Sequence, residues 1–210
     1  MFYFKIRYTF DITKCMFSFG NINEKLRVSR IDCTGETVVD LFAGIGYFSL
    51  QFAVHSNAKC LHLCEWNPNA VMALKKNLEL NRVSHKCFIH FGDNREVCPK
   101  GVADRVYMGL IPTSLDSLEV GCRAIDINSQ KRILHIHHNV SHFGAKNKSE
   151  VNQIWNKWAE DMALKVVGIM SDIHRDLKWD IEVLEINKVK AYAPHIDHLV
   201  LDLKCNSSDT

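Results

Sequence analysis

Short apolar runs rich in β-branched residues alternate along this chain with segments whose apolar residues recur every three to four positions. The runs are typical of buried strands, and the segments with the longer period are typical of helices packed on them. Strands are predicted at 37–42, 59–65, 87–91, 103–110, 132–138, 181–189 and 196–203, and helices at 47–55, 68–80, 115–124 and 150–173. This alternation predicts an α/β fold with a doubly wound, mostly parallel sheet.

Two local signals mark the ends of predicted elements. Asn67 can cap the helix at 68–80, and Pro68 suits the first helical position because its missing N–H needs no partner there. Ala193 and Pro194 predict a turn between the last two strands. Residues 1–30 fall outside the alternating pattern, and we expect an extended lead-in with a short helical turn near Asn23.

Length and composition narrow the class of protein. With 210 residues, 47% of them hydrophobic, the chain can bury one sizeable core, and no apolar stretch approaches the roughly 20 residues of a membrane span. The eight cysteines form no C-x-x-C pair and the N-terminus lacks a signal-peptide pattern, so we expect reduced thiols and a cytoplasmic protein without a membrane partner. The formal net charge is only +2, so any RNA affinity must come from a local patch of this chain or be supplied by another part or partner.

The first predicted strand runs directly into a Gly44-x-Gly46 turn, and the acidic residue Glu65 ends the second strand. A glycine turn lets the backbone approach a ligand, and a carboxylate at the next strand end can accept both hydroxyls of a ribose. Alone, Gly-x-Gly is often only a tight turn, and Glu65 could simply be a solvated helix cap. Their combination, with Asp93 after the third strand, favours a nucleotide-cofactor pocket.

The residues after the glycine turn narrow the choice of cofactor. A dinucleotide site needs a third glycine three residues after Gly46, where this chain has Ser49. The run from Asp40 through Ala43 to Gly46, with Glu65 and Gly92-Asp93-Asn94 downstream, resembles the S-adenosylmethionine site of the class I methyltransferase-like fold. The resemblance implies S-adenosylmethionine as group donor, and a seven-stranded sheet whose last strand is antiparallel.

Five longer runs carry a closer resemblance: 15–25, 64–68, 90–95, 109–112 and 192–195. Together they resemble the tRNA wybutosine-synthesizing protein 2 family, whose members are relatives of the tRNA guanine-N1 methyltransferases. The similarity extends from about Ile6 to Lys204, without the family's preceding N-terminal region and with a shortened stretch between Val140 and Trp155. It implies that residues 1–30 end a missing region and that 31–210 form the S-adenosylmethionine-binding catalytic domain.

The resemblance implies an enzyme that moves the 3-amino-3-carboxypropyl group of S-adenosylmethionine to a carbon of the wybutosine precursor base at position 37 of tRNA(Phe), releasing methylthioadenosine. The partner would be the tRNA(Phe) anticodon loop. Two alternatives are an inactive, truncated S-adenosylmethionine-binding module and a tRNA guanine-N1 methyltransferase. The run 109–112 stands where base N-methylating relatives carry an Asn-Pro-Pro-type motif, which argues against the methyltransferase.

The candidate site residues come from the turn and from the resemblance. Lys25 would by itself be interpreted as a solvated helix residue, and the resemblance makes it a cofactor contact. On the substrate side we expect Leu110, Pro112 and Arg95. The cofactor-binding set is Ser18, Lys25, Asp40, Ala43, Gly44, Gly46, Glu65, Asp93 and Asn94.

His135 and His137 are candidate catalytic residues, because the two-residue period of a strand puts both imidazoles on one face. They could orient the transferred group or steer a proton. The alternative is a pair of hydrogen-bonded strand-end histidines with a structural role. We expect no metal site, since no cluster of partnering ligands accompanies the two histidines.

Overall fold

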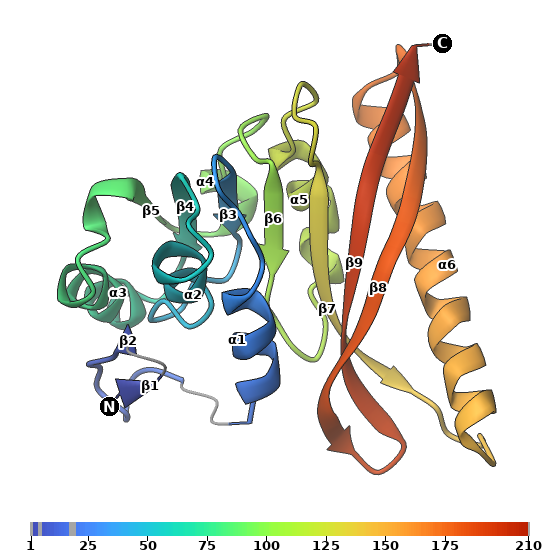
Figure 1. Cartoon of the computed structure of the whole chain (residues 1–210), viewed down its shortest axis with the longest axis horizontal. Coiled ribbons are helices and arrows are strands. Elements are labelled where there is room, and N and C mark those ends of the chain that lie inside the picture. Colours follow the sequence, from blue (N-terminus) through green and yellow to red (C-terminus); the bar gives the residue numbers. More distant parts are fainter. Residues whose placement is uncertain (1, 4–5, 17–19, 210) are drawn as a thin grey trace.

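The sheet of this protein has seven strands in the order β5-β4-β3-β6-β7-β9-β8 in the computed structural model, which describes residues 2–3, 6–16 and 20–209 (Figure 1). Strands β3, β4, β5, β6 and β7 are parallel, whereas β9 pairs antiparallel with both β7 and β8. The predicted mostly parallel sheet with an antiparallel last strand is confirmed. The strands are β3 (Thr37–Asp40), β4 (Cys60–Glu65), β5 (Cys87–Phe91), β6 (Arg105–Met108), β7 (Ile133–Ser141), β8 (Leu177–Ala193) and β9 (Ile196–Asp209).

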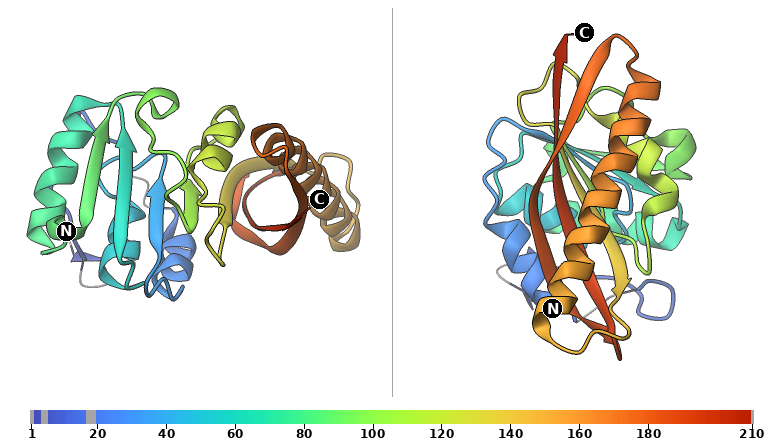
Figure 2. Two further views of the ribbon diagram at one scale, coloured as in Figure 1. Left: turned by 90° about the horizontal axis from the view of Figure 1, so that it is seen from above. Right: turned by 90° about the vertical axis from the view of Figure 1, so that its right-hand side faces the viewer.

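Helices cover both faces of the sheet, as a doubly wound fold requires (Figure 2). One face packs against α1 (Ile22–Ser29), α2 (Ser49–Val54) and α3 (Pro68–Leu80). The other packs against α4 (Asn94–Val97), α5 (Leu118–Ala124) and α6 (Lys148–Ile173). Smaller elements are the pair β1 (Phe2–Tyr3) and β2 (Ile6–Arg7) and the 3₁₀ turns η1 (Ser84–Lys86) and η2 (Leu115–Ser117).

Helix α3 begins as its sequence predicts. The side-chain oxygen of Asn67 accepts a hydrogen bond from Asn69 N over 2.9 Å, and Pro68 occupies the first turn. The cap satisfies one of the backbone N–H groups that a helix start leaves unpaired. This helix start follows directly on Glu65 at the end of β4, so it brings the first turn of α3 to the same edge of the sheet as the glycine turn.

The segment before β3 differs from the extended lead-in that we expected because residues 1–30 fall outside the alternating pattern. It contains the two-turn helix α1, in which Glu24, Lys25 and Val28 are buried, and Ile6 and Tyr8 are buried in the same core. Charged residues interrupt the apolar pattern of this segment, so its burial could not be read from periodicity. In the structure Glu24 accepts a hydrogen bond from Tyr107 of β6, and Arg27 pairs with Asp202 of β9.

The last two strands form a hairpin longer than predicted. Strand β8 begins at Leu177 rather than 181 and continues to Ala193, and β9 extends past 203 to Asp209. Their ends pair with each other, from Leu177 opposite Asp209 to Ala193 opposite Ile196, and α6 lies along the hairpin (Figure 1). Polar side chains are tolerated in these strands because much of β8 is exposed. In the described part of the chain, no helix is both long and apolar enough to cross a membrane.

Candidate active site

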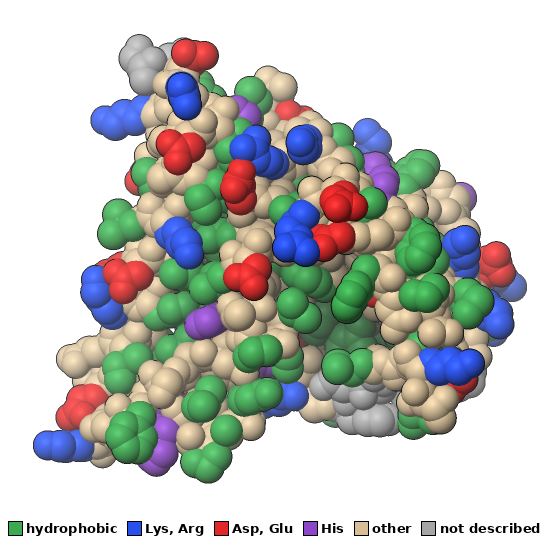
Figure 3. Space-filling model, turned by 180° about the vertical axis from the view of Figure 1, so that it is seen from behind, with side chains coloured by type: hydrophobic (Ala, Val, Ile, Leu, Met, Phe, Trp, Pro, Cys, Tyr) green, Lys and Arg blue, Asp and Glu red, His purple; other side chains and the backbone are tan. Residues whose placement is uncertain are grey.

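A cavity of about 480 Å³ opens at the carboxyl ends of β3, β4, β5 and β6. In doubly wound sheets ligands bind at this edge, where neighbouring loops diverge. Figure 3 shows the hollow with hydrophobic side chains around it and acidic and basic side chains together at one rim. Its lining includes Asn21, Gly44, Tyr47, Phe48, Glu65, Trp66, Asp93, Asn94, Arg95, Leu110, Ile111 and Ser117.

The floor of the cavity is the glycine turn after β3. Gly44 and Gly46 have φ values of 56° and 93°, in the left-handed region that other residues rarely adopt. Asp40 holds the turn in place, because its carboxylate accepts hydrogen bonds from Phe42 N at 3.1 Å and from Ser49 Oγ at 2.6 Å. A Cβ on Gly44 would meet no atom within 4 Å, whereas one on Gly46 would lie 3.1 Å from Leu74. Gly44 therefore faces open space, and Gly46 packs on α3.

Glu65 joins the end of β4 to this turn. One carboxylate oxygen accepts from Gly44 N over 2.7 Å, and the other accepts from Asn67 N over 2.7 Å. A carboxylate has about four lone-pair sites, so each oxygen retains one for a ligand. The side chain is 8% exposed and lines the cavity. Glu65 is thus held rigidly with acceptor capacity directed at a bound molecule.

The segment after β5 supplies Asp93, Asn94 and Arg95. Asp93 caps α4 by accepting from Arg95 N, and it forms an ion pair with the Arg95 side chain, whose Nε lies 2.9 Å away. These hydrogen bonds lower the pKa of Asp93 to about 2. Asn94 donates to Leu41 O over 3.2 Å and accepts from Ser117 Oγ over 3.1 Å. The Asn94 amide therefore ties the ends of β3 and β5 to η2.

Lys25 is buried rather than solvated, with 2% of its surface exposed. Its Nζ lies 3.6 Å from the ring centroid of Tyr47 and 5.1 Å from that of Tyr8, which are cation–π distances. Burial lowers the pKa of Lys25 to about 8. Lys25 is not among the described residues that line the cavity. It contacts the site through Tyr47, which does line the cavity.

The buried carboxyl of Asp40 predicts a pH dependence of folding. Burial raises its pKa from 3.8 to about 6 against the opposing hydrogen bond from Ser49. The folded protein therefore holds this proton more tightly than the unfolded chain, so the carboxyl's contribution to stability is full below about pH 4 and lost as the pH rises through about 6. The loss should amount to about 3 kcal/mol. Urea unfolding between pH 4 and 7 should show this slope in the wild type and a flatter curve in Asp40→Asn; identical curves would contradict it.

The structure brings most of the predicted cofactor residues together. Gly44, Glu65, Asp93 and Asn94 line the cavity, while Asp40, Ala43 and Gly46 support the turn beneath it. Ser18 lies outside the described residues. On the substrate side, Leu110 and Arg95 line the cavity, and Pro112 lies next to Ile111 with its carbonyl accepting from Asn139 N over 2.9 Å.

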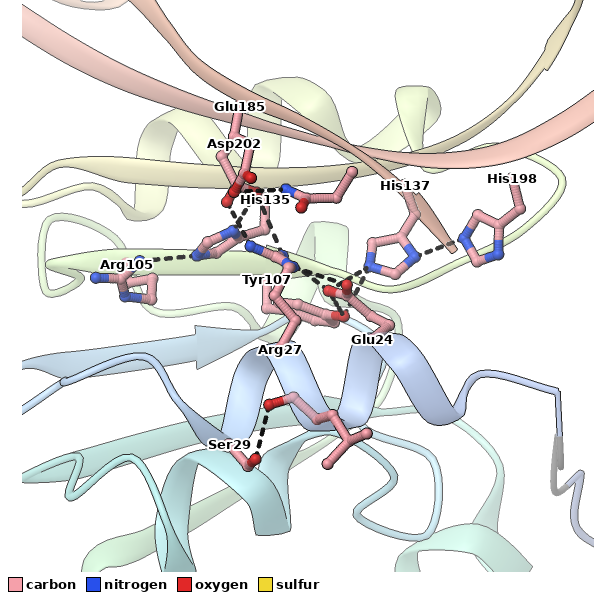
Figure 4. Close-up of polar contacts among 12 residues, drawn as sticks. Glu24, Arg27, Ser29, Arg105, Tyr107, His135, His137, Glu185, His198 and Asp202 are labelled. Carbon is pink, nitrogen blue, oxygen red and sulfur yellow. Dashed lines mark hydrogen bonds and ion pairs between the residues drawn. The ribbon is translucent and has the colours of Figure 1, made fainter. Parts of the chain in front are cut away.

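His135 and His137 share one face of β7 as predicted, and both are buried (Figure 4). His135 lies 2.6 Å from Asp202 and 2.9 Å from Arg105. His137 lies 2.8 Å from both Tyr107 Oη and His198 Nε2. Neither histidine lines the cavity among the described residues, so any part they play is exerted through neighbours. The described residues also contain no group of three or more potential metal ligands.

Several lining residues were not predicted from sequence. Asn21 precedes α1, and its buried Oδ1 has no hydrogen-bond partner among the described residues. Trp66 is 77% exposed at the cavity mouth, directly after Glu65. Ser117 reaches the site from η2. The position of Trp66 beside Glu65 was a usable signal, whereas Asn21 and Ser117 come from segments without a pattern that marks a site.

Comparison with known proteins identifies the family of this chain. The family model of the TRM5/TYW2 methyltransferase domain matches residues 4–167 of the chain. The chain belongs to this family. A relative from Danio rerio, named tRNA wybutosine-synthesizing protein 2 homolog, is 47% identical over 219 residues, covering 95% of this chain and 53% of the relative.

Two solved structures resemble this TRM5/TYW2 domain closely. M. jannaschii TYW2 in complex with AdoMet has a TM-score of 0.77 and 29% identity, covering 98% of this chain and 84% of that one. The complex of aTrm5 and tRNALeu has a TM-score of 0.66 and 30% identity, covering 93% of this chain and 49% of that one. This TRM5/TYW2 domain spans about half the length of the curated relatives it matches, with coverage of 53% in the Danio rerio protein.

Proposed function

We propose that this protein binds S-adenosylmethionine as a group donor in the cavity at the strand ends. Three features of the chain fit that ligand. The cavity volume of about 480 Å³ is in the range of small-molecule sites, Gly44 leaves open space where a side chain would stand, and Glu65 retains acceptor sites for ribose hydroxyls. The family member crystallised with AdoMet, M. jannaschii TYW2, supports the assignment.

Each end of the ligand has a residue suited to it. Glu65 would accept from the ribose hydroxyls, and Asp93 and Asn94 would address the adenine. Asn21 Oδ1, buried and unpartnered in the described structure, can accept from the ammonium of the methionine moiety. Tyr47 and Phe48 offer aromatic faces to a cation. Bound S-adenosylmethionine supplies a sulfonium that makes its attached carbons electrophilic.

The reaction we propose is transfer of the 3-amino-3-carboxypropyl group to the wybutosine precursor base at position 37 of tRNA(Phe), with release of methylthioadenosine. The observation that carries this choice is the end of β6, where Leu110 and Ile111 line the cavity. These apolar side chains offer no amide to grip the planar target nitrogen of a methylation substrate. Similarity to the Danio rerio tRNA wybutosine-synthesizing protein 2 homolog supports the same reaction.

The proposal also names an RNA partner and a cellular location for this protein. The aTrm5 complex with tRNALeu shows that a family member binds tRNA, and we propose the anticodon loop of tRNA(Phe) as the partner here. The cysteines of this chain are all free thiols, which supports a reducing compartment such as the cytoplasm.

Donor labelling tests which group is moved. Precursor tRNA(Phe) would be incubated with the full chain and S-adenosylmethionine labelled either in the methyl group or in the aminocarboxypropyl carboxylate. We expect label in the tRNA only from the second donor, and methylthioadenosine as the released nucleoside. Label from the methyl donor would establish the methyltransferase alternative instead. Donor binding without any transfer would establish the inactive binding module.

A further inference from the structure

The turn between β8 and β9 carries a run of sequence that does not serve the cavity. Four of the five runs that carry the family resemblance supply described residues to the cavity lining, among them Asn21, Trp66, Arg95 and Leu110. The fifth run, 192–195, is described throughout and lies outside that lining, at the tip of the β8–β9 hairpin. Loops on a rigid scaffold carry binding residues more often than other segments do. The position of this run therefore indicates a second contact surface, separate from the donor site.

An exposed aromatic surface forms where this turn meets the loop after β7. His142 N donates to His195 O over 2.8 Å, so the loop is tied to the turn. The Phe143 ring stands edge-on to the His195 ring, with 5.7 Å between the centroids, and Phe143 is 82% exposed. Tyr192, at the end of β8, is 49% exposed. We call the two segments, 142–147 and 192–195, the tip surface.

A buried carboxylate holds the tip surface in this shape. Asp197 is 2% exposed, and its Oδ2 lies 3.3 Å from His142 Nε2. Its Oδ1 lies 2.7 Å from Lys188 Nζ. The loop also closes on itself, since Ala145 N donates to His142 O over 3.1 Å. Phe143 is therefore presented to solvent by a fixed loop, so that little conformational entropy is lost when a partner binds its ring.

Lysine side chains flank the exposed rings. Lys146 and Lys148 are both exposed, and they follow Phe143 on the same loop and at the start of α6. Lys188 is 46% exposed although it pairs with the buried carboxylate. The acidic neighbour, Glu150, accepts two hydrogen bonds at the start of α6. Because the formal net charge of the chain is only +2, RNA binding requires a local group of cations such as this one.

Backbone contacts connect the tip surface with the mouth of the cavity. Leu110 and Ile111 line the cavity. The residue after them, Pro112, accepts from Asn139 N of β7 over 2.9 Å. From Asn139 to Phe143 the chain can extend no more than about 14 Å. Figure 1 shows the β8–β9 turn at the end of the molecule toward which β6 and β7 run. The tip surface and the cavity therefore open at the same edge of the sheet, at a distance that a few unpaired nucleotides can span.

We propose that the tip surface binds the tRNA beside the nucleotide in the cavity, with Phe143 stacked on an unpaired base and Lys146 and Lys148 on its phosphates. This inference rests on the tRNA partner of the proposed function. Unpaired bases of RNA loops stack on exposed aromatic rings, and lysines follow the phosphate backbone. A protein partner would fit a contiguous apolar patch better than one ring set among lysines. The anticodon loop is single-stranded around position 37 and offers bases in the required place.

The affinity of the full chain for precursor tRNA(Phe) tests the stacking contact. Loss of one stacked base in Phe143→Ala should weaken binding at least about fivefold, whereas Phe143→Trp should bind as tightly as the wild type or more tightly. Phe88→Ala is the matched control, because Phe88 is 53% exposed on β5 at the opposite edge of the sheet. It should leave the tRNA affinity unchanged. The affinity for S-adenosylmethionine, measured by calorimetry, should be the same in all three variants.

The salt dependence of the tRNA affinity tests the phosphate contacts. Replacing both lysines, in the double variant Lys146→Ala and Lys148→Ala, should lower the slope of log affinity against log salt by about 1 to 2, since each phosphate contact releases about one counterion. Lys157→Ala is the matched control further along α6. Its Nζ already pairs with Asp161 over 2.7 Å, so its removal should leave the slope unchanged.

A photoreactive benzoylphenylalanine in place of Phe143 locates the contact on the tRNA. It should crosslink to a nucleotide of the anticodon loop. Crosslinks confined to another arm of the tRNA or to a second protein chain would overturn the proposal, and so would wild-type tRNA affinity in Phe143→Ala. A loss of affinity that Phe88→Ala shares would overturn it as well. Binding of tRNA at the tip surface without any group transfer would instead overturn the proposed function alone.

Discussion

Arg27→Met is expected to lower the free energy of unfolding by about 3 kcal/mol, because it leaves two buried carboxylates without their cation. The Arg27 guanidinium donates to both oxygens of Glu24 at 2.8 Å and to Asp202 at 2.5 Å. Glu24 and Asp202 are 1% and 9% exposed, so water cannot replace the lost partner. Methionine retains most of the aliphatic volume, which separates the loss of charge from a loss of packing. Urea unfolding at pH 7 measures the difference.

An exposed ion pair provides the control for that variant. Arg123 pairs with Glu119 one helical turn away on α5, and the two side chains are 43% and 60% exposed. Arg123→Met should therefore cost about 0.3 to 0.5 kcal/mol, the usual value of a surface pair on a helix. Equal losses from the two variants would show that Arg27 stabilises the fold by packing alone and that α1 is not held by its charges.

Glu65→Ala is expected to weaken S-adenosylmethionine binding by about 1 to 3 kcal/mol, through loss of charge-assisted hydrogen bonds to the ribose. The substitution also frees Gly44 N and Asn67 N, which Glu65 now holds at 2.7 Å each, so part of the effect comes from a looser turn. Glu65→Gln retains one acceptor oxygen and should lose less. Isothermal titration calorimetry with S-adenosylmethionine measures both variants against the wild type.

Glu96→Ala is the matched control for the cofactor site. Glu96 is an exposed acidic residue on α4 at the same edge of the sheet, but it is outside the lining of the cavity. Its removal should leave the affinity unchanged. Unchanged affinity in Glu65→Ala as well would rule out Glu65 as a ribose ligand, provided that the variant unfolds at the wild-type temperature.

The sequence predicts the parts of the site that depend on local structure. Glu65 ends β4 and Gly44 follows β3, and because parallel strands end at one edge, their meeting at 2.7 Å follows from the alternation of strands and helices. The cap of α3 can also be predicted, because Asn67 binds the backbone N–H of Asn69, only two residues away. These features need only the periodicity of short segments and the end of each strand.

The buried polar groups could not be predicted in this way. Glu24 and Arg27 have the spacing of an ordinary solvated helix pair, and the partner that buries them, Asp202, is 175 residues from Arg27 in the chain. His198 sits on the last strand, with nothing in the local sequence to connect it with His137. Only the register of β9 against β7 brings these side chains to one face of the sheet. Long-range pairing of this kind leaves no periodic signal.

Mass spectrometry of nucleotide 37 tests the proposed aminocarboxypropyl transfer most directly. Precursor tRNA(Phe) would be incubated with the full chain and S-adenosylmethionine, with Glu65→Ala and Glu96→Ala in parallel. We predict that base 37 gains the mass of one aminocarboxypropyl group with the wild type and with Glu96→Ala, and far less of it with Glu65→Ala. A gain of one methyl group, or no gain with a wild-type chain that binds the donor, would contradict the proposed transfer.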